Sequence, residues 1–293
     1  MKYLQENIDI TNLSNFKTKA KTKYYFEINN EADILKLKEI FNFASKNKLK
    51  TIFVWAWTNM LFAFDFFNWI VIKNNLKWYT YNTKNKILEV YTWEKIWDIA
   101  EILENKYNQN IWHRFIWLPW SIWWALLWNA WCFWLEAESN FISSEVYNIK
   151  TWEIEIIDKK NAWFDYRNSI FKKTWNYLII KAFFDLSQII EKYPSDIDNI
   201  KFREELQPKW NSCWSFFKNP SREISAWKLI EEIWLKWYTH NTAYFSDIHA
   251  NFLMTNVDNW DYRDLIYLID LLTKKVKEKY DIILENEVRI IKN

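Results

Sequence analysis

Glycine is absent from this chain of 293 residues, whereas tryptophan occurs 23 times. At the usual glycine content of ~7%, a chain of this length would hold roughly 20 glycines. Tight turns and helix ends need residues with positive φ, and glycine adopts such values at the lowest cost. We therefore interpret most of the tryptophans as positions at which the natural protein has glycine. The simplest cause is a genetic code that reads UGA as glycine, applied to a gene translated with UGA as tryptophan.

The positions of several tryptophans support this interpretation, because they lie where turns and helix ends are expected. Two follow an asparagine, as in the Asn-Gly turn dipeptide, one separates two strand-like runs, and two follow the helical run 228–233, where glycine often ends a helix. These are Trp69, Trp260, Trp152, Trp234 and Trp237. Trp97 is kept as a possible tryptophan, because it lies early in a helical pattern over 94–105 where no turn needs glycine.

Cysteine and histidine are also scarce. The two cysteines, Cys132 and Cys213, form no disulfide framework, which suits a reducing cytoplasm. The three histidines, at positions 113, 240 and 249, are not spaced as metal ligands, so no metal site is predicted. The formal net charge is +2 with charges of both signs interspersed, so no nucleic-acid partner is expected. The N-terminal segment has no apolar core of the kind found in a signal peptide.

One long uncharged run, from Phe115 to Leu135, is about as long as the ~20 residues that cross a bilayer. Tryptophan prefers the membrane interface to the bilayer core, and Pro119 makes a continuous helix harder still. With glycine at the tryptophan positions, the run reads F-I-G-L-P-G-S-I-G-G-A-L-L-G-N-A-G-C-F-G-L. That sequence favours a loop whose backbone can approach a ligand, so no membrane span is expected.

With the same substitution, segment 117–131 resembles the motif G-x-P-G-S-x-G-G-A-x-x-x-N-A-G of the UDP-N-acetylenolpyruvoylglucosamine reductases. Three further motifs of that family are matched in the same order. They are F-D-Y-R-N-S at 164–169, C-W-S-F-F-K-N-P at 213–220 with tryptophan for glycine, and L-E-N-E-V at 284–288. The resemblance covers nearly the whole chain, and four motifs in one order are specific together.

The resemblance implies an α+β fold, with a two-subdomain FAD-binding domain of the PCMH type and a C-terminal α+β substrate-binding domain. We place the subdomains at 1–78 and 79–192 and the C-terminal domain at 193–293. Periodicity predicts helices and strands in an α+β order. The predicted helices are 31–47 with Asn30 as N-cap, 94–105, 196–206, 225–233 and 261–279. The predicted strands are Thr51–Val54, 176–185, 242–246, 251–255 and 287–292, with alternating pairs within 79–92 and 142–158.

Two loops are expected to hold FAD. A Cβ atom would keep the backbone away from the pyrophosphate, so the chemistry needs glycine there. The first loop follows the strand at 51–54 and contains Trp55, Ala56, Trp57, Thr58, Asn59 and Met60. The second contributes Pro119, Trp120, Ser121, Trp123, Trp124, Asn129 and Ala130. The family resemblance further implies NADPH as the hydride donor.

The resemblance assigns three catalytic residues. A guanidinium at Arg167 suits the carboxylate of an enolpyruvyl group and the enolate that it becomes. Ser215 matches the proton donor of the family. Glu287 is the expected electrostatic partner of Arg167, and Glu285 is its rival, although the family pattern favours the second glutamate.

Tyr166, Lys218 and Asn219 flank these motifs and are expected to bind the substrate. His249 lies in the family-like segment S-D-I-H-A-N-F and is assigned a structural role.

The implied function is the NADPH-dependent, FAD-mediated reduction of UDP-N-acetylglucosamine enolpyruvate to UDP-N-acetylmuramate in peptidoglycan precursor synthesis. A cytoplasmic monomer is expected. Another FAD oxidoreductase of the PCMH type would share the two loops but should lack the motifs at 164–169 and 213–220. If the tryptophans are literal, a non-enzymatic protein that binds partners or membrane surfaces through tryptophan is the alternative.

Overall fold

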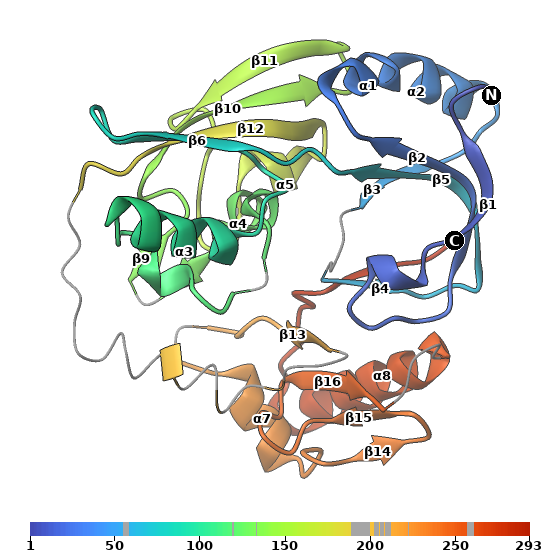
Figure 1. Cartoon of the computed structure of the whole chain (residues 1–293). Coiled ribbons are helices and arrows are strands. Elements are labelled where there is room, and N and C mark those ends of the chain that lie inside the picture. Colours follow the sequence, from blue (N-terminus) through green and yellow to red (C-terminus); the bar gives the residue numbers. More distant parts are fainter. Residues whose placement is uncertain are drawn as a thin grey trace. The chain divides into compact units, whose positions relative to one another are not determined.

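The structure, a computed structural model, describes residues 1–54, 59–118, 120–132, 134–188, 200–201, 205, 208, 212–221, 223–256 and 261–293. Contacts divide the chain into two compact units, whose elements are labelled in Figure 1. The first unit combines Met1–Phe26, Ala44–Lys73 and Leu206–Asn293, and the second combines Glu27–Phe43 with Asn74–Glu205. The boundaries expected after residues 78 and 192 stay a prediction.

A four-stranded sheet opens the first unit, in the order β1-β2-β5-β3. Strands β1 and β2 pair antiparallel, while β3 and β5 pair parallel. The residues of β3 and β5 are largely apolar and β-branched, and their inward side chains are fully buried. The bounds are β1 (Gln5–Asp9), β2 (Lys21–Ile28), β3 (Thr51–Val54) and β5 (Phe66–Asn74), with a short 3₁₀ helix η1 (Thr11–Leu13).

The helix predicted over 31–47 is two helices, α1 (Glu31–Leu35) and α2 (Leu37–Lys46). Asn30 begins α1 as predicted, in a capping box in which its side chain accepts from the Asp33 backbone N–H. The Asp33 carboxylate in turn accepts from the Asn30 backbone N–H and from the Lys36 ammonium. Lys36 is the C-cap of α1 and separates it from α2. The apolar periodicity continues across Lys36, so it did not predict this break.

A second sheet of the first unit has the order β13-β16-β15-β14, and Figure 1 shows α8 lying along it. Helix α8 buries Leu265, Leu268, Ile269, Leu272 and Val276, a spacing that places one apolar stripe against the core. The elements are β13 (Ser212–Ser215), α7 (Ala226–Glu232), β14 (Thr239–His240), β15 (Ala243–Phe245), β16 (Phe252–Thr255) and α8 (Tyr262–Tyr280).

Two short parallel strands, β4 (Met60–Phe62) and β17 (Arg289–Ile291), join distant parts of the first unit. The Ala63 backbone N–H donates to the Ile291 carbonyl at 2.9 Å and extends the pairing. The core of this unit likewise mixes early and late residues, since Phe16 and Leu61 belong to the cluster that holds Phe216 and Leu268. The first unit is therefore formed by both ends of the sequence.

The second unit is built on a five-stranded antiparallel sheet in the order β11-β10-β12-β7-β6. Figure 1 shows α3, α4 and α5 gathered beside this sheet. The strands are β6 (Tyr79–Asn82), β7 (Ile87–Tyr91), β10 (Phe141–Asn148), β11 (Glu153–Asp158) and β12 (Tyr177–Asp185), with a small pair β8 (Trp131–Cys132) and β9 (Leu135–Glu136). The helices are α3 (Ile96–Tyr107), η2 (His113–Phe115), α4 (Ile122–Leu127) and α5 (Ile170–Thr174).

These elements confirm the α+β class and most of the predicted periodic segments. The run 115–135 is not one helix, because the α-helix found among its described residues, α4, has 6 residues and is followed by β8 and β9. Among the described residues, no helix has the length and apolar character needed to cross a membrane. The charged helix predicted over 196–206 falls largely outside the described residues.

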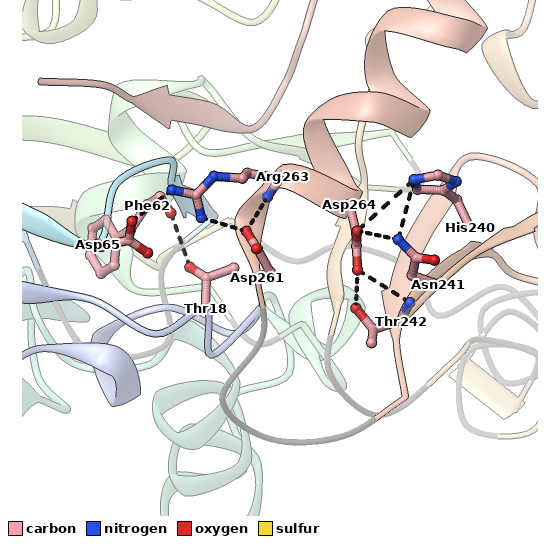
Figure 2. A network of polar contacts seen from close by, with 9 residues as sticks. All are labelled: Thr18, Phe62, Asp65, His240, Asn241, Thr242, Asp261, Arg263 and Asp264. Carbon is pink, nitrogen blue, oxygen red and sulfur yellow. Dashed lines mark hydrogen bonds and ion pairs between the residues drawn. The ribbon is translucent and has the colours of Figure 1, made fainter.

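Figure 2 shows how the β14–β15 hairpin is fastened to the start of α8. The Asp264 carboxylate accepts from the Thr242 hydroxyl at 2.5 Å and from the Asn241 amide at 2.9 Å. The His240 ring lies 4.0 Å from the same carboxylate and stacks on Tyr267 with ring centroids 3.8 Å apart. The neighbouring Arg263 pairs are exposed and are worth little to stability.

The Asp264 contacts predict a pH-dependent stability. Burial alone would raise the pKa of Asp264, but the hydrogen bonds from Thr242 and Asn241, with the charge of His240, outweigh it and lower that pKa. The stabilisation is therefore present above the ordinary carboxyl pKa and is lost as pH falls through the lowered pKa. Asp264→Asn should lower the free energy of unfolding at neutral pH by about 1.5–3 kcal/mol.

Urea unfolding of both proteins at neutral and acidic pH measures this effect. The exposed Asp270 of the same helix supplies the control Asp270→Asn, which should change little. A difference between wild type and Asp264→Asn that persists unchanged in acid would contradict the assignment.

Candidate active site

Left-handed backbone is concentrated at tryptophan. Of 17 described residues with positive φ, eight are tryptophans, with φ between 44° and 71°. A bulky side chain is an outlier in this region, where each non-glycine residue costs about 1–2 kcal/mol. These eight, called the left-handed tryptophans below, are Trp117, Trp134, Trp152, Trp163, Trp175, Trp214, Trp234 and Trp237.

Burial does not account for the side chains at these positions. Five of the eight left-handed tryptophans are exposed, and Trp134 and Trp234 reach 84% and 89% exposure. An indole in solvent at positive φ gains little from packing and strains the backbone. Glycine satisfies both observations, since it has no side chain to bury and adopts positive φ freely.

The individual turn predictions have mixed outcomes. Trp152, between β10 and β11, and Trp234 and Trp237, after α7, have the left-handed conformation that the turn interpretation requires. The turn predicted at Asn68-Trp69 is wrong, because both residues lie inside β5, where pairing in the sheet between β2 and β3 overrides the dipeptide signal. Trp260 lies outside the described residues.

Trp97, kept as a possible tryptophan, lies within α3 as expected. Its indole N–H is buried and has no hydrogen-bond partner among the described residues. The ring packs on Trp117, with centroids 4.4 Å apart.

The second predicted cofactor loop is held by backbone contacts to the start of α3 and to Thr92, which directly follows β7. Ser121 caps α4 by accepting from the Trp124 backbone N–H at 3.2 Å. The Trp120 carbonyl accepts from the Ile96 N–H at 2.9 Å, and the Trp123 N–H donates to the Thr92 carbonyl at 2.6 Å. The loop backbone is therefore fixed without help from any indole.

The tryptophans of this loop fill space instead. Trp123 and Trp124 are almost fully buried, and their rings contact one another at 6.4 Å between centroids. The Trp120 indole N–H is buried with no hydrogen-bond partner among the described residues. Trp117, which begins the loop, is left-handed. As tryptophan these residues do not fit a flavin pyrophosphate; as glycine they leave the bare backbone that one requires.

The motif at 164–169 forms a tight turn with Tyr166 and Arg167 at its tip. Asp165 and Asn168 exchange backbone hydrogen bonds of 3.1 and 3.0 Å across it. Arg167 is half-buried and has φ of 52°, and its carbonyl accepts from the Lys172 ammonium at 2.8 Å. Positive φ at a non-glycine residue strains the backbone, and such strain clusters at functional sites, which makes this turn a candidate functional position. Tyr166 is exposed beside it.

The structure brings this turn and the second cofactor loop together. The Asn129 amide donates to the Glu136 carboxylate at 3.1 Å and to the Asp165 carbonyl at 3.4 Å. Asn129 and Ala130 are buried, and Asn129 also has positive φ. The Ser169 hydroxyl donates to the Leu127 carbonyl at 2.9 Å. Two motifs that are separate in sequence thus form one site region in the second unit.

The motif at 213–220 lies in the first unit between two other segments. Ser215, at the end of β13, is half-buried and stands opposite Phe252 of β16. Left-handed Trp214 precedes it, where the family motif has glycine. On the other side, the Phe216 carbonyl accepts from the Glu287 N–H at 2.8 Å. The backbones of Ser215 and Glu287, both predicted to be catalytic, are therefore neighbours.

The two candidate glutamates differ in environment. Glu287 is buried, with 9% exposure. Glu285 has an exposed side chain and pairs with the Lys218 ammonium at 2.5 Å. Buried charge acts more strongly on a reacting group than exposed charge. This contrast favours Glu287, as predicted, although its role stays a prediction.

Asn219 and the first cofactor loop complete the first unit. The Asn219 side-chain oxygen Oδ1 accepts from the Ala226 N–H at the start of α7, at 3.0 Å. Asn59 and Met60 are buried beside β17, and the Met60 carbonyl accepts from the Cys213 thiol at 3.9 Å. Trp55, Ala56, Trp57 and Thr58 of the first loop, and Pro119 of the second, lie outside the described residues.

Sequence reasoning missed one residue, Asn251, although it noted the segment around it. Asn251 is buried and contacts the backbone directly after Ser215. His249, two residues earlier, is half-buried and packs against Phe252, and burial lowers its pKa. The predicted Arg167–Glu287 partnership stays a prediction, since the two residues belong to different units.

Comparison with known proteins gives one family. Residues 207–291 match the family described as UDP-N-acetylenolpyruvoylglucosamine reductase, C-terminal domain. A curated UDP-N-acetylenolpyruvoylglucosamine reductase of Prochlorococcus marinus subsp. pastoris is 30% identical over 98% of this chain and 96% of its own length. UDP-N-acetylenolpyruvoylglucosamine reductase 2 of Bacillus cereus is 38% identical over 47% of this chain and 46% of its own.

Among solved structures, the UDP-N-acetylenolpyruvylglucosamine reductase of Thermus caldophilus aligns with a TM-score of 0.76. The alignment covers 99% of this chain and 100% of that one at 16% identity, so it shows that the two proteins share a fold.

Proposed function

This chain belongs to the UDP-N-acetylenolpyruvoylglucosamine reductase family, and we propose in detail how its residues carry out the family reaction. It is a UDP-N-acetylmuramate dehydrogenase of peptidoglycan precursor synthesis. The enolpyruvyl ether of UDP-N-acetylglucosamine gains a hydride at its terminal carbon and a proton at its α-carbon, and becomes the lactyl ether. NADPH loses the hydride, so the electrons balance.

We propose FAD as the cofactor, held in the natural protein by the two loops with glycine at the tryptophan positions. Asn59, Met60, Ser121, Asn129 and Ala130 are the described non-tryptophan residues assigned to it. When bound, FAD supplies the transfer of hydride from NADPH to the substrate. Support comes from the left-handed backbone at Trp117 and the backbone hydrogen bonds that fix the loop independently of its indoles.

Arg167, Ser215 and Glu287 are proposed to carry the chemistry on carbon. The planar guanidinium of Arg167 binds the enolpyruvyl carboxylate with two parallel hydrogen bonds and stabilises the enolate as charge builds there. Ser215 gives its proton to the α-carbon and regains one from solvent, since an enolate is basic enough to deprotonate a hydroxyl. Glu287 sets the electrostatic environment of that transfer. The strained turn at Arg167 is the observation that carries this assignment.

Tyr166, Lys218 and Asn219 are proposed to bind the nucleotide sugar. Lys218 lies shortly after the strand that ends at Ser215, and its positive charge suits the negatively charged diphosphate of the substrate. On binding, its ammonium would exchange the Glu285 carboxylate for the diphosphate. We place the reaction in the cytoplasm, where NADPH is available and where Cys132 and Cys213 would remain thiols. We expect the enzyme to act as a monomer.

Substrate-dependent NADPH consumption tests the proposal. Protein made with glycine at the tryptophan positions should oxidise NADPH rapidly only when UDP-N-acetylglucosamine enolpyruvate is present, and should form UDP-N-acetylmuramate. Arg167→Lys should lower kcat/KM by about 10-fold or more, because a single ammonium cannot form the paired hydrogen bonds. Oxidation of sugars by oxygen without NADPH would instead indicate another FAD oxidoreductase.

A further inference from the structure

Asn251 contacts the polypeptide between the proposed proton donor and the proposed substrate-binding residues through three hydrogen bonds. Its side-chain oxygen accepts from the Phe217 backbone N–H at 3.0 Å, and its side-chain amide donates to the Phe217 carbonyl at 2.8 Å. Its own carbonyl accepts from the Phe216 N–H at 2.8 Å. One residue therefore occupies three of the four backbone hydrogen-bonding groups of Phe216 and Phe217.

This arrangement replaces a strand ladder at a point where the ladder is interrupted. The pairing of β13 with β16 shifts register between Ser212 and Ser215 and ends opposite Phe252. Beyond it, the Asn251 side chain supplies the donor and acceptor that a next strand residue would have supplied. Asn251 is 3% exposed, so water cannot take over these hydrogen bonds if the amide is removed.

The opposite edge of the same segment is held by the 285–288 region. The Glu287 N–H donates to the Phe216 carbonyl, and the Lys218 N–H donates to the Glu285 carbonyl at 2.9 Å. The backbone after Ser215 is therefore fixed from both sides. On this side, the contacts to Phe217 are made by the Asn251 side chain rather than by a strand backbone.

We propose that Asn251 is a positioning residue that holds Ser215 in the geometry for proton transfer by clamping the Phe216–Phe217 backbone. The inference rests on the proposed function, because it assumes that Ser215 protonates the α-carbon. Asn251 itself touches no reacting atom. A displacement of about 1 Å in a catalytic group can slow a reaction by roughly 10²-fold, so loss of the clamp is expected to affect the proton-transfer step strongly.

The test uses glycine-containing holoenzyme and measures two half-reactions by stopped-flow absorbance. Asn251→Ala should leave bleaching of the flavin by NADPH within about 2-fold and slow the return of colour with the enolpyruvyl substrate by about 10-fold or more. In the Ser215→Ala background, Asn251→Ala should slow the second half-reaction by no more than about 2-fold further, since it acts through Ser215. Asn251→Asp, which keeps the shape and the acceptor but loses the donor, should show the same selectivity if Asn251→Ala does not fold.

Asn140→Ala is the matched control, because Asn140 is also buried and its amide donates to a backbone carbonyl, that of Asp185. Both alanine variants should lower the thermal midpoint, but only the Asn251 variant should change the ratio of the two half-reactions. Equal slowing of both half-reactions, or additive effects in the double variant, would overturn the proposal. A wild-type enzyme whose colour does not return with substrate would refute the proposed function instead.

Discussion

Glycine at the eight left-handed tryptophans is expected to raise the free energy of unfolding by about 4–8 kcal/mol. Each left-handed tryptophan stores about 1–2 kcal/mol of backbone strain. Glycine also makes the unfolded chain more flexible, which lowers the free energy of unfolding by roughly 0.4–1 kcal/mol per position and offsets part of the relieved strain. The strain at eight positions, roughly 8–16 kcal/mol, equals the whole stability of an ordinary protein, about 5–15 kcal/mol.

The same change is expected to create flavin binding. Protein expressed with all the tryptophans should be colourless, because the indoles of Trp120, Trp123 and Trp124 occupy the loop interior. Protein with glycine at these positions as well should purify yellow, with FAD near one equivalent. Urea unfolding and a flavin absorbance spectrum of the two proteins measure both effects.

Trp97→Gly, made alone, is the control for these experiments. Trp97 lies in the interior of α3 with ordinary helical backbone, so glycine there should destabilise rather than stabilise. Helix propensity alone costs about 0.5–1 kcal/mol relative to alanine, and the loss of the ring contact with Trp117 adds to this cost. Stabilisation by Trp97→Gly of the same size as at the left-handed positions would remove the conformational argument. Independently, UGG codons in the gene at the left-handed positions, or tryptophan found there by peptide mass spectrometry of the native protein, would contradict the recoding hypothesis.

Ser215→Ala is expected to separate the two half-reactions more sharply than any other single change. Transfer of hydride from NADPH requires no proton donor to carbon, so bleaching of the flavin should remain nearly intact. Return of colour with the enolpyruvyl substrate should slow by roughly 10² or more, the usual effect of losing a general acid. Ser215→Cys should retain more activity than Ser215→Ala, since a thiol can also donate a proton.

Ser144→Ala provides the control, since Ser144 is a buried strand serine whose hydroxyl has no hydrogen-bond partner among the described residues. Both half-reactions should proceed at wild-type rates in that variant. If Ser215→Ala slows bleaching as much as the return of colour, Ser215 positions the cofactor or supports the fold, and the proton donor lies elsewhere.

Long periodic segments of the fold could be predicted from the sequence, because the spacing of apolar residues alone determines whether each is a helix or a strand. The apolar stripe of α8 and the alternation in β10 and β11 survive in the structure within a few residues. Strand β1 could not be predicted, since its residues are polar and mostly exposed and its conformation comes from pairing with β2. Strand β13 has only four residues, and its pairing is irregular.

The candidate site also combines features that local sequence reveals with features that depend on contacts between distant segments. Arg167 and Ser215 could be named because their motifs are contiguous, but nothing in F-D-Y-R-N-S indicates that the arginine would have positive φ. The role of Asn251 depends on a segment 34 residues earlier in the chain, so local sequence carries no signal of it. The contrast between buried Glu287 and exposed Glu285 likewise arises only when the chain folds.

The parallel pairing of β4 with β17 has a consequence for the order of events during synthesis. On the ribosome, β4 emerges long before its partner strand exists, and the larger part of the second unit, Asn74–Glu205, is made in between. Domains fold as units as they emerge from the ribosome. The second unit is therefore expected to be folded while the backbone groups of β4 that pair with β17 are still unpaired. A ribosome that stalls before β17 would therefore release a chain in which Asn59 and Met60 lack the strand that they pair with. Such a chain would be bound by chaperones or degraded by proteases rather than act as a slow enzyme.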